Sequence, residues 1–180
     1  GSYGIGPSRL MGTIVEVLRE KVEGSGDLGK IASIAWRDKD KVYVNPRRKT
    51  IIQLDTLSFP AWEFFPMQDY SNNVKILTEQ PINEKSLVFS TLRGCINACN
   101  FCYRMEKGVR LRSIDNVINE LKILVDEYGI KYFQIFDEMF VINKTRLFEF
   151  EEKLSRNKLE IFFSCDARVD ILDKQIVQSL

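Results

Sequence analysis

Histidine is absent from this sequence of 180 residues. Its absence excludes a Ser-His-Asp triad, a Cys-His dyad and a zinc-binding helix of the His-x-x-x-His type. A metal centre in this chain must therefore rest on cysteine, aspartate or glutamate, and the sequence contains only four cysteines.

The sequence also lacks an excess of one charge and a long apolar run. Its 26 Lys and Arg residues balance 25 Asp and Glu residues, whereas nucleic-acid-binding proteins usually carry a basic excess. No apolar run approaches the ~18 residues of a membrane span, and no signal peptide is visible. We therefore expect a cytoplasmic protein with neither nucleic-acid nor membrane partners, and its oligomeric state stays open.

Three stretches of the chain differ in pattern. Residues 1–25 predict a helix from Thr13, because apolar residues recur at helical spacing until a Gly-Ser-Gly sequence. Residues 26–84 predict two short strands, over 31–36 and 42–44, followed by an irregular connector rich in proline and aromatic residues.

Residues 85–180 alternate between strand and helix patterns. Strands are predicted over 87–89, 132–136 and 159–164, and helices from the cap Ser113 to 128, over 144–156 and after the cap Asp173. Three such units predict an α/β fold with a parallel sheet or part of a barrel. A barrel needs about six to eight units, and the chain starts without Met, so we expect a fragment.

The cysteines Cys95, Cys99 and Cys102 form a C-x-x-x-C-x-x-C motif directly after the first of these strands. Three thiolates so close in sequence can hold three irons of a 4Fe–4S cluster and leave the fourth iron open to another ligand. Zinc is the alternative, but a structural zinc site needs four ligands. Only Cys165 remains, and its distant position favours a buried small apolar residue. Disulfides are disfavoured without a secretory signal.

Polar residues follow the other two strands of the predicted sheet. Asp137 and Glu138 come after the second strand, and Ser164 and Arg168 lie at and after the end of the third. In parallel α/β barrels, the carboxyl ends of the strands carry the chemistry. We therefore expect these side chains to project to the same rim as the cysteine motif.

The cysteine motif, with aromatic Phe101 before its last Cys, resembles that of the radical S-adenosylmethionine superfamily. The order of the later motifs is similar to radical enzymes with a cobalamin-binding domain, which include methyltransferases and the anaerobic magnesium-protoporphyrin ester cyclase. These motifs are Arg110-Leu111-Arg112-Ser113, Phe136-Asp137-Glu138-Met139-Phe140, Asn143, Arg146 and Arg168-Val169-Asp170.

The resemblance implies a domain plan. Residues 85–180 would be the N-terminal half of a radical-SAM (β/α) barrel, preceded by a linker over 26–84. Residues 1–25 would be the last helix of a Rossmann-like cobalamin-binding domain. The Asp-x-His-x-x-Gly cobalt-ligand motif is absent, so cobalamin would be bound only with a further, upstream domain.

The resemblance also implies a role for each candidate residue. Cys95, Cys99 and Cys102 would hold the 4Fe–4S cluster. S-adenosylmethionine would contact Phe101 through its adenine, Asp137 and Glu138 through its amino group, Arg168 through its carboxylate, and Ser164 as a further binding residue. The alternatives are core packing for Phe101, a loop-start role for the acidic pair, and an ion pair of Arg168 with Asp166 or Asp170.

The implied activity is cleavage of S-adenosylmethionine to a 5′-deoxyadenosyl radical, with a reductant such as flavodoxin or ferredoxin. Methyl transfer to an unactivated carbon of a small molecule is the favoured outcome. A cyclase or rearrangement enzyme is the alternative, and a zinc-stabilised module without catalysis is a third. The basic run Arg104, Lys107, Arg110 and Arg112 is interpreted as a solvated loop in preference to a phosphate or cluster contact.

Overall fold

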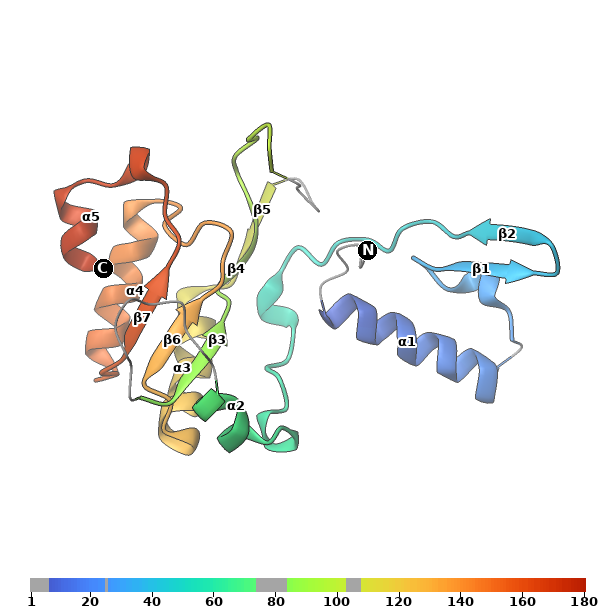
Figure 1. Cartoon of the computed structure of the whole chain (residues 1–180), viewed down its shortest axis with the longest axis horizontal. Coiled ribbons are helices and arrows are strands. Elements are labelled where there is room, and N and C mark those ends of the chain that lie inside the picture. Colours follow the sequence, from blue (N-terminus) through green and yellow to red (C-terminus); the bar gives the residue numbers. More distant parts are fainter. Residues whose placement is uncertain (1–6, 25, 74–83, 103–107) are drawn as a thin grey trace. The chain divides into compact units, whose positions relative to one another are not determined.

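The computed structural model describes residues 7–24, 26–73, 84–102 and 108–180. The chain divides into two compact units, residues 1–51 and 52–180, and both contain helices and short strands (Figure 1). The boundary between the units falls inside the segment 26–84, which the sequence analysis treats as a single linker. None of the described helices is both long and apolar enough to cross a membrane.

The first unit contains a helix and a hairpin. Helix α1 spans Pro7–Val22, and strands β1 (Ala35–Asp38) and β2 (Lys41–Val44) pair in antiparallel fashion. The helix begins before the predicted Thr13, at a proline, which is favoured in a first helical turn. Strand β1 begins later than predicted, because Ser33 has a φ of 66° and turns the chain out of the extended conformation.

The start of the second unit is an irregular connector, as predicted. It contains the 3-10 turns η2 (Leu54–Thr56) and η3 (Trp62–Phe64) and the short helix α2 (Met67–Asn73). Asp55 accepts hydrogen bonds from the backbone N–H of Ser113 at 2.9 and 3.2 Å. This contact attaches the connector to the start of a helix 58 residues further along the chain.

A three-stranded parallel sheet forms the centre of the second unit, with strand order β3-β6-β7. The elements are β3 (Ser86–Phe89), α3 (Ile114–Tyr128), β6 (Tyr132–Ile135), α4 (Lys144–Arg156), β7 (Phe162–Cys165), η4 (Val169–Ile171) and α5 (Lys174–Ser179). The predicted α/β class is confirmed. A partial barrel stays a prediction.

Local sequence signals position these helices. The side chains of Ser113, Asn143 and Asp173 accept hydrogen bonds from backbone N–H groups in the first turns of α3, α4 and α5. Gly129, with a φ of 68°, ends α3 in the left-handed conformation that glycine adopts without strain. The predicted helix limits are thereby confirmed.

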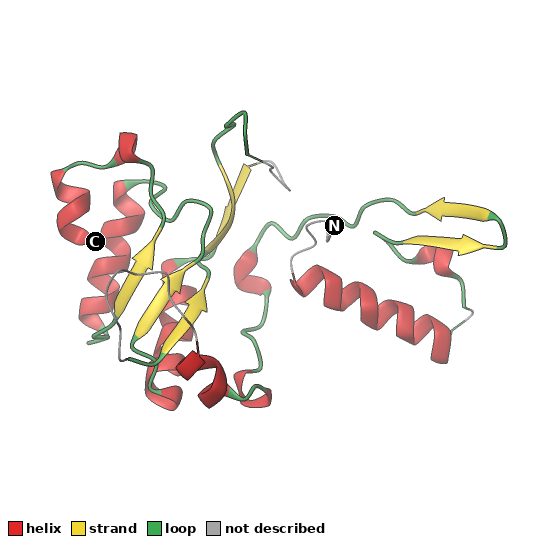
Figure 2. Cartoon of the chain, viewed as in Figure 1, coloured by secondary structure: helices red, strands yellow, loops and turns green. Residues whose placement is uncertain are grey.

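Alternation along the strands divides the sheet into two faces. Leu87, Phe133 and Phe163 stand side by side in the register and belong to or pack against a core cluster that includes residues of α3 and α4. Figure 2 shows the helices beside the three-stranded sheet. On the opposite face, Val88 and Phe162 are exposed. Helices therefore cover one face of the sheet, and the other face is in part open.

A second hairpin, which the sequence analysis does not predict, separates β3 from α3. Strands β4 (Leu92–Cys95) and β5 (Gly108–Leu111) pair antiparallel. We call β4, β5 and the cysteine-bearing loop between them the cysteine hairpin. The prediction that the cysteine motif directly follows β3 is therefore wrong. It begins at Cys95, the last residue of β4, because this strand lies between β3 and the cysteine loop. Before it, the backbone of Gly94 has a φ of 84° and lies close to Gly108.

Candidate functional site

The three motif cysteines lie at the far end of the cysteine hairpin. Cys95 ends β4, and Cys99 and Cys102 lie in the loop that follows, where the N–H of Cys102 donates to the carbonyl of Cys99 at 3.2 Å. All three are free thiols, with Cys95 and Cys99 half-buried and Cys102 exposed. Tyr103, Arg104 and Lys107, which the sequence analysis also considered, lie outside the described residues.

The described residues contain no group of three or more Cys, Asp or Glu side chains arranged to hold a metal ion. The three thiols therefore belong to one hairpin but are not gathered around one point. Their chemistry fits an iron–sulfur cluster, since cysteine thiolates are its usual ligands. Cys165 does not join them as a fourth zinc ligand in this arrangement.

The sulfurs of Cys95 and Cys99 accept hydrogen bonds from N–H groups. Both the backbone N–H and the side-chain amide of Asn97 donate to Sγ of Cys95, at 3.4 and 3.5 Å. Nη1 of Arg168, from the loop after β7, lies 3.7 Å from Sγ of Cys99. Such contacts strengthen when the sulfur is ionised, because the acceptor is then charged. Asn97 was not among the predicted site residues, although it stands between the first two cysteines.

Arg168 also forms an ion pair with Asp170, as one of its alternatives predicted. Its Nε and Nη2 lie 2.9 and 2.8 Å from the two carboxylate oxygens of Asp170. The hydrogen bond from the Arg168 guanidinium holds the pKa of the Asp170 carboxyl below its ordinary value. One guanidinium therefore joins the loop after β7 to the cysteine loop, and its role toward a ligand carboxylate stays a prediction.

Glu138 and Asp137, which are adjacent in sequence, have different surroundings. Glu138 is exposed, and its Oε2 accepts a hydrogen bond from the N–H of Gly94 at 3.2 Å. Asp137 is only 1% exposed, and both of its oxygens accept hydrogen bonds from residues 90–92. Burial raises the pKa of the Asp137 carboxyl, and these hydrogen bonds oppose that shift. Of the two, Glu138 is the one that is accessible to a ligand.

The remaining candidates are dispersed around the same end of the sheet. Phe101 is 93% exposed, so the core-packing alternative for it is wrong. Ser164 pairs in register with Gln134 on β6, on the face opposite the core cluster. Cys165 is half-buried against the core, and burial raises the pKa of its thiol to about 11, in agreement with a buried apolar role.

Arg112 is not part of a solvated loop, as the sequence analysis expected of the basic run. Its guanidinium forms an ion pair with the buried Glu120, donates to the side chain of Asn116 and stacks over the rings of Phe59 and Phe89. Arg110 belongs to strand β5. Of the two described members of the basic run, Arg110 therefore lies in a strand and Arg112 in an internal ion pair.

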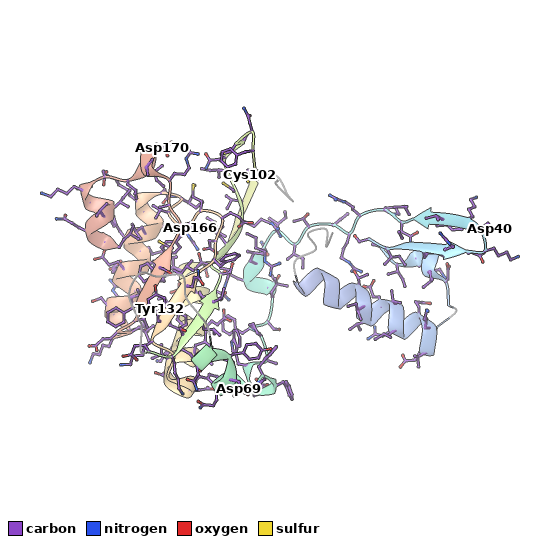
Figure 3. The ribbon with its side chains drawn as sticks, viewed as in Figure 1. Asp40, Asp69, Cys102, Tyr132, Asp166 and Asp170 are labelled. Carbon is purple, nitrogen blue, oxygen red and sulfur yellow. The ribbon has the colours of Figure 1, made fainter. Side chains whose placement is uncertain are left out.

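Two of the predicted side chains contact the cysteine hairpin, Glu138 at the N–H of Gly94 and Arg168 at the sulfur of Cys99. Cys102, Asp166 and Asp170 lie toward the same end of the second unit, whereas Tyr132, at the start of β6, lies toward the opposite end (Figure 3). The fold and the site together define an α/β chain with a cysteine-bearing hairpin at the carboxyl-end rim of a parallel sheet.

Comparison with known proteins relates this chain to methyltransferases and a cyclase. It is 29% identical over 170 residues to an uncharacterized methyltransferase of Pyrococcus horikoshii, covering 93% of this chain and 34% of the relative. It is 29% identical over 143 residues to the cytidylyl-2-hydroxyethylphosphonate methyltransferase of Streptomyces wedmorensis, covering 66% and 27%.

A third relative is the anaerobic magnesium-protoporphyrin IX monomethyl ester cyclase of Rubrivivax gelatinosus, which is 28% identical over 150 residues, covering 81% of this chain and 26% of the relative. The chain thus spans about a third or less of the length of these curated relatives. No protein-family model matches the chain. The names agree with the two enzyme classes that the sequence resemblance implies.

Proposed function

We propose that this chain is part of a radical S-adenosylmethionine enzyme, in which Cys95, Cys99 and Cys102 hold a 4Fe–4S cluster. The observation that carries the proposal is the position of the three free thiols, at the end of a hairpin beside the carboxyl-end rim of a parallel sheet. Relatives named methyltransferase and cyclase support the same class of chemistry. Cluster binding would require the loop to bring the three sulfurs together.

Two polar side chains are available to a ligand beside the cysteine loop. Glu138 is exposed and accepts a hydrogen bond from the N–H of Gly94, so its carboxylate can also accept a hydrogen bond from the amino group of S-adenosylmethionine. Arg168 presents a fork of N–H donors that suits a carboxylate, and Asp170 occupies part of that fork in this structure. We propose that the ligand's carboxylate takes the place of Asp170.

The cluster, when bound and reduced by a donor such as flavodoxin or ferredoxin, would supply the electron that cleaves S-adenosylmethionine. The chain's own residues bind and orient this ligand. We propose methyl transfer to a small molecule as the outcome, which two of the methyltransferase relatives support by name. This chain has no histidine to ligate cobalt, so cobalamin is not assigned to any of its residues.

The test is anaerobic reconstitution with iron and sulfide, followed by metal analysis and EPR of the reduced chain with and without S-adenosylmethionine. We expect about four irons per chain, as one 4Fe–4S cluster requires, and a reduced-cluster signal that changes when the ligand is added. A colourless protein that binds one zinc instead would contradict the proposal and support a structural zinc module.

Cysteine variants make this test specific. Cys99→Ala should lose the cluster signal, whereas Cys165→Ala should keep it, because Cys165 is half-buried against the core and outside the motif. Cys165→Ala is therefore the matched control for removal of a thiol. Loss of metal in both variants would indicate a four-cysteine site, as zinc requires.

A cyclase is the second candidate, because one relative is named as a cyclase. The two activities differ in what becomes of the methyl group. Assay of the intact enzyme should give a methylated product if the first proposal is correct. Production of 5′-deoxyadenosine without any methylated product would favour the cyclase.

A further inference from the structure

The cysteine hairpin is not attached to the parallel sheet of the second unit by pairing of the described strands. Among the described strands, β4 and β5 pair only with each other and not with the sheet β3-β6-β7. A two-stranded hairpin is at best marginally stable by itself in water. The orientation of the cysteine loop must therefore depend on the contacts that hold the hairpin from outside.

The base of the hairpin is held by two charged side chains. This base, which we call the neck, consists of residues 90–92, which lead into β4, and of Arg112 after β5. The N–H of Arg112 donates to the carbonyl of Thr91 at 3.1 Å. Asp137, the second residue after β6, and Arg146, in the first turn of α4, both reach it.

Asp137 holds the first side of the neck. Its Oδ1 accepts from the hydroxyl of Ser90 at 2.9 Å and from the N–H groups of Thr91 and Leu92 at 2.8 and 3.2 Å. Its Oδ2 accepts from the hydroxyl of Thr91 at 2.6 Å. Hydrogen bonds to a buried carboxylate are stronger than those between neutral groups. A single side chain therefore fixes three consecutive residues.

Arg146 holds both sides of the neck. Its Nη1 donates to the carbonyl of Arg112 at 2.8 Å, and its Nη2 lies 3.3 Å from the carbonyl of Thr91. One guanidinium thus joins the two chain segments that enter and leave the hairpin. The carboxylate of Asp137 is among the negative charges that oppose the lowering of the Arg146 pKa by burial.

The two residues after Asp137 contact the hairpin at successive points beyond the neck. Glu138 accepts from the N–H of Gly94, and the side-chain amide of Asn97 lies 3.3 Å from Sδ of Met139. Asn97 in turn donates to the sulfur of Cys95. The segment after β6 therefore follows the hairpin from its base to the first cysteine.

We propose that Asp137 and Arg146 are positioning residues for the cysteine motif, because they fix the neck of the cysteine hairpin and so place its thiols beside Glu138 and Arg168. This role differs from direct contact of Asp137 with a ligand. The proposal rests on the proposed function, since positioning of the thiols has a purpose only if they bind a cluster.

The experiment combines hydrogen exchange with cluster analysis on the full chain. Asp137→Asn removes the charge, and Thr91→Val removes one hydroxyl donor while keeping its shape. We expect both variants to exchange the amides of β4 and β5 about tenfold faster, as loss of a hydrogen bond to a charged group predicts. The amides of α3 should be unchanged. Iron content after reconstitution should fall, and the EPR signal should become heterogeneous.

Two further variants serve as controls. Thr91→Ser keeps the hydroxyl and should restore both hairpin protection and the cluster signal. Asp115→Asn removes an exposed carboxylate that pairs with Lys153 of α4, and it should change neither.

Three outcomes would overturn the positioning role. The first is unchanged amide exchange in β4 and β5 in both variants. The second is faster amide exchange there together with a normal iron content and EPR signal. The third is equally faster amide exchange in α3, which would show that the residues support the core in general. Hydrogen exchange is measured on the metal-free chain, so it remains informative about the neck if the wild-type chain binds no iron. A wild-type chain that binds no iron would contradict the proposed function, and the positioning role would then have no purpose.

Discussion

Arg112 and Glu120 form an ion pair inside the second unit, with 2.6 Å between Nη2 and Oε2, where their side chains are only 14% and 4% exposed. Burial raises the pKa of the Glu120 carboxyl, and the charge and hydrogen bond of Arg112 oppose that shift. The pair joins the end of the cysteine hairpin to α3, so its protonation affects the stability of this region.

The raised pKa of Glu120 predicts a specific dependence of stability on pH. The folded chain holds this proton more tightly than the unfolded chain, so the free energy of unfolding should fall as the pH rises from the ordinary value of 4.5 through the raised pKa. Glu120→Gln lacks the titrating group and should lose this part of the decline. Urea denaturation of both proteins across that pH range measures the difference, and equal slopes would contradict the prediction.

Gly94→Ala should disrupt the cysteine hairpin. A Cβ at this position would collide with the backbone oxygen of Gly108, and a φ of 84° adds strain of roughly 1–2 kcal/mol for a residue with a side chain. Gly108→Ala is the matched control. Its φ is similar, 80°, but a Cβ added at Gly108 would have no atom of the described residues within 4 Å, its chain neighbours left aside.

We expect Gly94→Ala to lose more cluster than Gly108→Ala, while the circular dichroism of the helices stays the same in both. The measurement is the iron content of each reconstituted variant. Equal iron content in the two variants would show that the close approach of β4 and β5 has no influence on the cysteine motif.

Cys165 should react far more slowly with iodoacetamide than Cys102. Burial raises the pKa of the Cys165 thiol to about 11, so only about one thiol in a thousand is ionised at a pH near 8, and the thiolate is the reactive form. Cys102 is exposed. Mass spectrometry of the metal-free chain after timed alkylation measures both rates. Comparable rates at the two cysteines would contradict the buried role of Cys165.

Arg168→Gln should weaken binding of S-adenosylmethionine without preventing cluster assembly, if the proposed function is correct. The variant loses the charged fork but no cysteine. Asp170→Asn should have the opposite effect, because it removes the charge that pairs with Arg168 in this structure. Titration of the EPR change with S-adenosylmethionine compares the two apparent affinities. Tighter binding by Arg168→Gln would exclude a contact between Arg168 and the ligand's carboxylate.

Ser113→Ala should lower the free energy of unfolding of the second unit by about 1 kcal/mol, the usual cost of removing a helix N-cap. Its hydroxyl accepts from the N–H of Asn116 at 3.1 Å. Ser113→Asp retains a cap acceptor and should stay close to the wild type. Denaturant unfolding followed by far-UV circular dichroism provides the measurement, and an unchanged midpoint for the Ala variant would contradict it.

Local sequence patterns were sufficient to predict the secondary structure of residues 113–156 and to identify the cysteine motif. Caps such as Ser113 and Asn143, and the glycine at 129, act within a few residues of their own positions, so local patterns predict helix limits well. The spacing of three cysteines is likewise a local property. The α/β class followed from the alternation of such local elements.

The roles of the charged residues depend on contacts between segments that are distant in the sequence. Asp137 and Glu138 are neighbours in sequence, but one is buried against residues 46 positions earlier and the other is exposed at the hairpin. Arg112 belongs to a basic run, and a buried partner eight positions away turns it into an internal ion pair. Contacts across the fold fix burial and partners, and a carboxylate or guanidinium takes its function from its partners.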